Sequence, residues 1–209
     1  MTGQGSWQQS GEKKIAVFAS GSGSNLQVLL DRAGTGDLGM AEIVLVVSDK
    51  PDSKAVERAQ RAGVETCAFI PRQFADKVAY ETAILAALRE KQVDFIVLAG
   101  YMRLVGPTLL EPFRGRIINL HPSLLPMFPG KDAIGQALAA GVAETGVTVH
   151  LVDEGMDTGP IIAQERVPIL PEDTKESLTR RIQAVEHRLL PQVVANFTKM
   201  NNTVVGGQT

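Results

Sequence analysis

Residues 14–25, KIAVFASGSGSN, join a short apolar run to a loop of alternating glycine and serine. The apolar run at 14–19 predicts a buried strand, and a helical pattern follows the loop at about residues 26–32. A strand, a glycine-rich turn and a helix in this order form the first unit of an open α/β sheet. Ligands of such sheets bind beyond the carboxyl ends of the strands, so this stretch predicts both a fold class and the edge that carries a site.

The rest of the chain continues the alternation of strands and helices. The β-branched run AEIVLVVS at residues 41–48 is typical of a strand buried on both faces, as in a parallel sheet. The other strands expected in the first half are residues 64–70, 94–99 and 116–120, with helices at 54–62 and 74–91. The apolar stripe of the second helix is expected to consist of Val78, Ile84, Leu85 and Leu88.

The second half begins with a proline-rich loop and then changes pattern. A helix is expected near residues 132–140, a half-buried strand at 146–152, a neighbouring strand at 161–167, and a long helix at 174–196 that Pro191 interrupts. The whole order predicts an α/β fold with an open, mostly parallel twisted sheet and helices on both faces.

Length and composition agree with one folded domain. The chain has 209 residues, of which 44% are hydrophobic and 21% are charged, as in ordinary soluble globular proteins. We expect a flexible N-terminal arm at residues 1–12, a single domain at 13–200 and a frayed tail at 201–209. Trp7 lies in the arm and is therefore not expected in the core.

Charge and cysteine content exclude several classes of function. The net charge of −2 does not support a nucleic-acid or anionic-membrane surface, since both need a basic excess. The single cysteine, Cys67, allows neither an internal disulfide nor a cysteine-rich zinc site, and no HExxH is present, so no metal is expected. No segment approaches the roughly 20 apolar residues of a membrane helix. The polar N-terminus also lacks a secretory pattern, so a cytoplasmic location is expected.

The loop Gly21-Ser22-Gly23-Ser24-Asn25 is the first candidate site. A helix N-terminus preceded by glycines offers free N–H groups to a phosphate. The third glycine of GxGxxG is replaced by Leu26 and the P-loop lysine is missing, which favours a single phosphate over NAD or ATP. Ser24 and Asn25 could also cap the helix, and a plain glycine-rich turn is the alternative.

The second candidate is Asn119-Leu120-His121-Pro122. On an extended backbone Asn119 and His121 point to one side while Leu120 points to the core. An amide beside an imidazole suits the stabilisation of an oxyanion and the movement of a proton. A histidine that is merely hydrogen-bonded at the start of a loop is the alternative.

The third candidate is the acidic loop at residues 152–160. A carboxylate there could orient the histidine or accept a proton, while magnesium binding and simple turn formation are the alternatives. In the preceding strand Thr148 and His150 share one face, which either lines the same cavity or holds an ordinary hydrogen-bonded histidine.

No good covalent nucleophile is present in the sequence. There is no GxSxG elbow, and Cys67 lies in an apolar run that predicts a buried, unreactive thiol. Direct transfer between two bound substrates is therefore favoured over covalent catalysis. Gln183, Glu186 and His187 lie on one side of the last helix, an arrangement that is usually a solvated face.

Five segments together closely resemble the phosphoribosylglycinamide formyltransferases, a branch of the superfamily that uses formyltetrahydrofolate. These are ASGSGSNLQ, VLAGYMRL, INLHPSLLP with FPGKDAIGQAL, GVTVHLVDEGMDTGPII and QAVEHRLLP, within about residues 13–194. The resemblance implies a Rossmann-like formyltransferase fold. It also implies transfer of the formyl group of 10-formyltetrahydrofolate to the amino group of glycinamide ribotide in purine (IMP) biosynthesis, through a tetrahedral intermediate.

The resemblance also implies roles for particular residues. The catalytic set would be Asn119, His121 and Asp157, and the ribotide would contact Gly23, Ser24, Asn25, Gln183 and Glu186. The folate would contact Lys77, Met102, Arg103, Leu104, Val105, Asn119 and Asp153, with lysine at position 77 where relatives often have arginine. The implied partners are these two small molecules, without nucleic acid, membrane or metal, in a monomer or homodimer.

Three other functions remain open at this point. Formyltetrahydrofolate deformylases share the catalytic residues but carry an additional N-terminal domain, for which the arm is too short. Methionyl-tRNA formyltransferases add a C-terminal domain, whereas this acidic chain ends at Thr209. A non-catalytic sensor of nucleotide phosphates would use the glycine loop alone and would leave Asn119, His121 and Asp157 unexplained.

Overall fold

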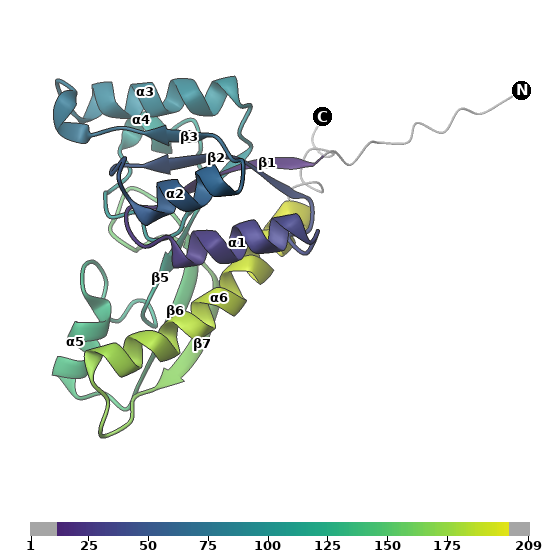
Figure 1. Cartoon of the computed structure of the whole chain (residues 1–209). Helices are drawn as coiled ribbons and strands as arrows, with labels where there is room; N and C mark the ends of the chain where they lie inside the picture. The colour runs from purple at the N-terminus through teal and green to yellow at the C-terminus, as the bar shows by residue number, and fades with distance from the viewer. Residues whose placement is uncertain (1–11, 201–209) are drawn as a thin grey trace, which may run out of the picture.

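The computed structural model describes residues 12–200 and contains one seven-stranded sheet (Figure 1). The strand order is β3-β2-β1-β4-β5-β6-β7, with β1 to β5 parallel and β6 and β7 antiparallel. The strands are β1 (Lys13–Phe18), β2 (Ala41–Ser48), β3 (Thr66–Ala68), β4 (Phe95–Leu98), β5 (Ile117–His121), β6 (Glu144–Leu151) and β7 (Ile161–Pro168). The predicted open, mostly parallel sheet is therefore confirmed.

Helices cover both faces of the sheet, as predicted. One face packs against α1 (Ser24–Gly34), α2 (Lys54–Arg61), α5 (Ala133–Ala140) and α6 (Lys175–Met200). The other packs against α3 (Lys77–Glu90) and α4 (Pro107–Leu110), and a 3-10 helix spans Pro71–Gln73. Alternate side chains of β1 serve the two cores, because Ile15 and Val17 lie in the first and Ala16 and Phe18 in the second.

The sheet reverses its strand order between β1 and β4. The chain builds β1, β2 and β3 outward and then returns to place β4 on the other side of β1. The loops that follow β1 and β4 consequently meet at the carboxyl edge, where Ser20 N donates to Gly100 O at 3.1 Å and Met102 N donates to Ser20 Oγ at 2.9 Å. Sheets of this kind bind ligands at such a reversal.

The last helix differs from the prediction. We expected an interruption at Pro191, but α6 runs from Lys175 to Met200 through this proline. Pro191 removes one backbone hydrogen bond. Leu189, Leu190 and Val193 are buried on either side of it, and their packing against the first core stabilises the continuous helix.

The strand β6 is more deeply buried than predicted. Its alternating pattern suggested one solvated face, yet every residue from Thr145 to His150 is buried. The segment after His121 covers the second face, where Thr148 Oγ1 donates to Ser123 O at 2.6 Å and accepts from Leu125 N at 3.1 Å. The polar face of β6 therefore satisfies backbone groups of a loop and not water.

The start of α3 also differs from the prediction. The helix begins at Lys77, where the Asp76 side chain caps it by accepting from Ala79 N at 2.7 Å. Val78 is 60% exposed, so its assignment to the apolar stripe is wrong. The buried face follows Tyr80, Ile84 and Leu88, and Val78 lies about 200° around the helix from Tyr80.

Some expectations lie outside the described residues. The tail at 201–209 and the arm at 1–12, apart from residue 12, fall there together with Trp7. Among the helices of residues 12–200, none combines the length and apolar character that a membrane crossing needs.

Candidate active site

The structure brings Asn119, His121 and Asp157 together. Asn119 and His121 lie at the end of β5, and Asp157 lies in the loop between β6 and β7. Asn119 Nδ2 donates to Asp157 Oδ1 at 3.3 Å, and His121 Nδ1 lies 3.5 Å from Asp157 Oδ2. Leu120 between them is buried in the first core. The alternation of an extended strand thus places the amide and the imidazole on one side, against the same carboxylate.

The imidazole of His121 is held through Nε2 and faces Asp157 through Nδ1. Its Nε2 lies 2.8 Å from the Phe128 carbonyl oxygen. A carbonyl oxygen only accepts hydrogen bonds, so we assign the hydrogen to Nε2. The Nδ1 edge then faces Asp157 and is the edge that can exchange a proton with a reacting group.

His150 is a fourth member of this cluster. Its Nδ1 lies 2.8 Å from the Leu151 carbonyl oxygen and its Nε2 lies 3.1 Å from Asn119 Nδ2. With the hydrogen on Nδ1, Nε2 accepts one of the two Asn119 amide hydrogens while Asp157 accepts the other. The sequence left the role of His150 open, and its place beside Thr148 on one strand face was the only signal.

The Asp157 carboxylate accepts hydrogen bonds from several donors. Its backbone has φ of +57°, an uncommon conformation for a residue with a side chain, and its Oδ2 also accepts from Gly130 N at 2.7 Å. Burial by itself raises the pKa of this carboxyl. The His150 and His121 rings, which attract the carboxylate when they are protonated, and the Gly130 N–H outweigh burial and hold the pKa below its usual value. The carboxylate is therefore ionised at neutral pH.

The glycine loop differs in detail from the prediction. Gly23 is the N-cap of α1 with φ of +67°, and neither Ser24 nor Asn25 caps the helix. Asn25 Nδ2 instead donates to Glu186 Oε2 on α6 at 2.9 Å. Within residues 12–200, no backbone N–H group of residues 21–25 donates a hydrogen bond to protein. The turn therefore presents free donors at a helix N-terminus, as an anion site requires.

Glu186 is buried, although a polar set such as Gln183, Glu186 and His187 on one side of a helix usually faces solvent. Its side chain faces Asn25, and the residue is only 8% exposed. Burial raises the pKa of the Glu186 carboxyl above its ordinary value, and the hydrogen bond from Asn25 opposes this only in part. Gln183 lies three residues earlier on the same helix and is partly buried.

Four of the residues expected to contact a folate, residues 102–105, lie in the segment after β4. Met102 and Leu104 are 67% and 59% exposed, and the guanidinium of Arg103 lies over the Tyr80 ring. Val105 packs against the second core. The far end of the segment is fixed by Glu81, whose Oε1 accepts from Gly106 N at 2.7 Å.

Two further folate-side candidates already have protein partners. Lys77 Nζ lies 3.7 Å from Glu81 Oε1, and its side chain is 48% exposed. Asp153 Oδ1 accepts from Gly155 N at 3.0 Å and from Thr158 Oγ1 at 2.7 Å. Asp153 therefore stabilises the turn of its own loop.

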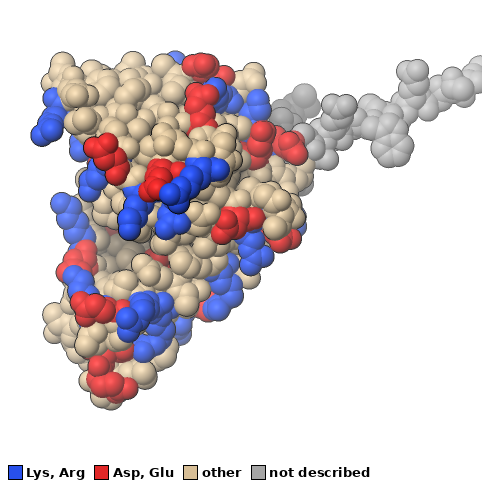
Figure 2. Space-filling model, viewed as in Figure 1, with Lys and Arg blue, Asp and Glu red and all other residues tan. Residues whose placement is uncertain are grey.

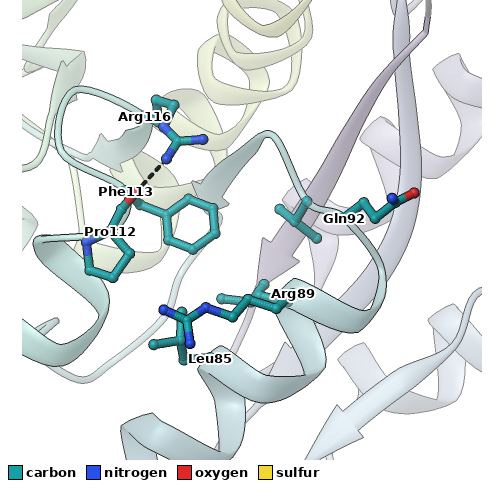
Figure 3. Close-up of a pocket in the computed structure, with 8 residues that line it drawn as sticks. Leu85, Arg89, Gln92, Pro112, Phe113 and Arg116 are labelled. Carbon is teal, nitrogen blue, oxygen red and sulfur yellow. Dashed lines mark hydrogen bonds between the residues drawn. The ribbon is translucent and has the colours of Figure 1, made fainter.

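The surface is hollowed at the carboxyl edge of the sheet. Figure 2 shows this hollow on the left, between the part with α2 and α3 and the part with α5, with Lys and Arg side chains on its rim. A separate cavity of about 410 Å³ lies at the opposite, amino edge (Figure 3). It is lined by Leu85, Leu88, Arg89, Gln92, Val93, Pro112, Phe113 and Arg116, and none of the candidate residues contributes to it.

The described part of the chain also offers no arrangement of three or more His, Cys, Asp or Glu residues that could hold a metal ion. The Asn119 amide donates hydrogen bonds to the neighbouring His150 and Asp157 side chains. Such a set of an amide, two imidazoles and a carboxylate can stabilise a developing oxyanion and transfer protons.

Comparison with known proteins gives a consistent result. The model of the formyl transferase family matches residues 13–194. Phosphoribosylglycinamide formyltransferase of Bacillus subtilis (strain 168) is 50% identical over 190 residues, which are 91% of this chain and 97% of that protein.

Two crystal structures extend this similarity to three dimensions. Glycinamide ribonucleotide transformylase 1 from Geobacillus kaustophilus has a TM-score of 0.87 and 56% identity, over 90% of this chain and 99% of that chain. Phosphoribosylglycinamide formyltransferase from Bacillus halodurans has a TM-score of 0.88 and 52% identity, over 93% and 100%. The chain therefore belongs to the formyl transferase family.

Proposed function

We propose that this protein transfers the formyl group of 10-formyltetrahydrofolate to the amino group of glycinamide ribotide, a step of purine (IMP) biosynthesis. The observation that carries the proposal is the convergence of the Asn119 amide and the His121 imidazole on the Asp157 carboxylate, at 3.3 and 3.5 Å. The match to the formyl transferase family and the relatives named for this reaction support it.

The reaction needs a neutral amine and a stabilised oxyanion. The amine nitrogen forms a bond to the formyl carbon, and the carbonyl electron pair moves onto the oxygen to give a tetrahedral intermediate. That intermediate collapses as its bond to the folate N10 breaks, so the amine loses one proton and N10 gains one. Donors that meet the oxygen only in the intermediate accelerate such a step.

The catalytic cluster provides these donors. We assign the oxyanion to Asn119 Nδ2 and to His121 Nδ1 when that nitrogen is protonated. Asn119 Nδ2 makes two hydrogen bonds, and the one to Asp157 is the longer. The oxyanion would take the place of Asp157 as the acceptor of that bond. Asp157 is a weak base because its pKa is lowered, so its role is to orient His121 and a proton-carrying water.

The ribotide would extend from this cluster towards the N-terminus of α1. Its phosphate fits the free N–H groups of Gly23, Ser24 and Asn25. The Asn25 Oδ1 is buried and accepts no hydrogen bond in the described chain, so it suits a donor of the ribotide. Glu186 and Gln183 on α6 would contact the glycinamide end.

The folate would lie along the segment after β4. Met102, Arg103, Leu104 and Val105 would flank the pterin, and Lys77 offers positive charge to the carboxylates of the folate tail. Asp153 would act through the turn that it holds beside Asp157. We place these functions in one domain of residues 13–200, while the cytoplasmic location and the monomeric or dimeric state stay predictions.

One assay separates this function from its rivals. The protein is mixed with 10-formyltetrahydrofolate, and release of tetrahydrofolate is followed by absorbance with and without glycinamide ribotide. Release only with the ribotide supports the proposal. Release without it indicates a deformylase, release only with charged initiator tRNA indicates the tRNA enzyme, and no release in any arm indicates a sensor.

A further inference from the structure

Three consecutive carbonyl groups of the glycine loop are hydrogen-bonded to protein. Gly21 O accepts from Ala55 N at 3.1 Å, and Gly23 O accepts from Gln27 N at 2.8 Å. Ser22 O, between them, accepts from the Arg58 side chain, whose Nε lies 2.9 Å away. Backbone geometry thus fixes the outer two carbonyls, whereas the middle one depends on a side chain.

The orientation of these carbonyls matters because an anion is expected beside them. Carbonyl oxygens carry partial negative charge and repel a phosphate, whereas N–H groups attract it. Within residues 12–200 the N–H groups of residues 21–25 have no protein acceptor. The loop attracts an anion only while its carbonyls stay turned away from the site.

Arg58 is itself held at two points. Its Nη1 donates to Gln27 Oε1 on α1 at 2.9 Å while its Nε donates to Ser22 O. Gln27 is fixed in turn, since its Nε2 donates to Asp31 Oδ1 at 2.8 Å. A planar guanidinium can make both bonds at once, which a lysine ammonium on a flexible stem does poorly.

The α2 helix that carries Arg58 is in direct contact with the loop. A Cβ added to Gly23 would lie 2.8 Å from Ala55 Cα, so the turn packs against the first residues of α2. In the part of the chain that the structure describes, Arg58 forms no ion pair with a carboxylate. Its positive charge is therefore available to the anion site.

We propose that Arg58 is a positioning residue for the phosphate of the ribotide. It holds the Ser22 carbonyl away from the phosphate and adds a positive charge that no carboxylate of residues 12–200 neutralises in an ion pair. The inference rests on the proposed function for the identity of the ligand. It adds a residue that the sequence did not indicate, because Arg58 lies on a different helix, 36 positions after Ser22.

The test compares Arg58→Gln and Arg58→Lys with wild type and with Arg61→Gln as the matched control. Arg61 lies on the same helix but pairs with Glu57 on the surface. We expect Arg58→Gln to raise KM for the ribotide about tenfold or more, as for a lost charge-assisted hydrogen bond. Its kcat and its KM for the folate should stay within about twofold of wild type. The ribotide KM of Arg58→Lys should lie between those of wild type and Arg58→Gln, and the ribotide KM of Arg61→Gln should match that of wild type.

A binding measurement separates this inference from the enzymatic assignment. Inorganic phosphate is titrated into wild type and Arg58→Gln, and the backbone amide signals of residues 21–25 are followed by NMR. We expect shifts in wild type and about tenfold weaker binding in Arg58→Gln, whether or not the protein transfers formyl groups. Equal affinities, no shifts in wild type, or equal losses in kcat and both KM values would overturn the role of Arg58.

Discussion

Asn119 and His150 lie opposite each other on two neighbouring antiparallel strands, and Asn119 Nδ2 lies 3.1 Å from His150 Nε2. The pairing register of β5 and β6 brings together two residues that are 31 positions apart. His150 is fixed by the Leu151 carbonyl, so it orients the amide of Asn119 towards Asp157. The fold thus adds an orienting histidine to the three residues that sequence patterns indicated.

Replacement of His150 by alanine should reduce kcat through the misorientation of Asn119. Loss of one partner of a buried hydrogen bond is worth about 1–3 kcal/mol, so we expect a reduction of about tenfold to a hundredfold. Steady-state kinetics of His150→Ala, Asn119→Ala and the double variant provide the measurement. If His150 acts through Asn119, the double variant is hardly worse than Asn119→Ala. Fully multiplicative effects would contradict this role.

The variants His121→Ala and Asp157→Ala should abolish measurable turnover while the protein stays folded. Removal of one oxyanion donor typically lowers kcat by about 10²–10³. Both side chains lie at the carboxyl edge of the sheet, outside the two hydrophobic cores, so circular dichroism should be unchanged. Near-normal turnover in either variant would remove the proposed mechanism.

Substitution of Gly23 by alanine should weaken binding of the ribotide. The residue has φ of +67°, and the added Cβ would lie 2.8 Å from Ala55 Cα, so the loop has to move. Gly36→Ala is the matched control, since Gly36 has φ of +75° but open space around its Cβ position. We expect both variants to lose stability through the positive φ, with the larger loss of unfolding free energy in Gly23→Ala, and a raised ribotide KM only in Gly23→Ala. A raised KM in both variants would show that backbone strain alone is responsible.

The buried carboxyl of Glu186 should make stability depend on pH. Its pKa lies above the ordinary value of 4.5, chiefly because burial disfavours the charge. The folded state therefore binds this proton more tightly than the unfolded state. The stabilisation is complete below pH 4.5 and is lost as the pH rises through the folded pKa. The unfolding free energy of wild type relative to Glu186→Gln should fall as the pH rises above 4.5 in urea titrations.

Asp157 should show the opposite dependence and serves as the comparison. Burial raises the pKa of this carboxyl, but its hydrogen bonds and the neighbouring imidazoles bring the pKa below the ordinary 3.8. Its stabilisation is present above pH 3.8 and is lost as the pH falls through the folded pKa. The difference between wild type and Asp157→Asn should therefore shrink on acidification. Slopes of the same sign for both pairs would contradict one of the two assignments.

Cys67 should be unreactive in the folded protein. Burial, with a smaller contribution from the charge of Glu65, raises the pKa of its thiol to about 11. Only the thiolate reacts with alkylating reagents. Iodoacetamide at about pH 8 should label Cys67 slowly in native protein and rapidly in urea, as measured by mass spectrometry. Fast labelling under native conditions would show that the third strand opens locally.

Sequence patterns predicted the elements well where burial follows local periodicity. The predicted strand at 41–48 has the observed bounds of β2, because its consecutive residues Leu45, Val46 and Val47 are all buried, as the continuous apolar run indicates for a strand covered on both faces. The patterns gave wrong predictions where contacts with distant segments determine burial or helix continuity. The burial of Thr148 depends on the Ser123–Leu125 loop, and the continuity of α6 at Pro191 depends on packing of its flanking leucines.

By itself, the sequence determined the alternation of strands and helices, the glycine-rich turn after the first strand and the placement of Asn119 and His121 on one side of a strand. These features depend on neighbours within a few residues, so local backbone geometry is sufficient. Only the tertiary structure decided that His150 faces Asn119, that Glu186 is buried against Asn25 and that Arg58 holds Ser22 O. Such contacts arise from strand register and helix packing between distant segments, which no local pattern records.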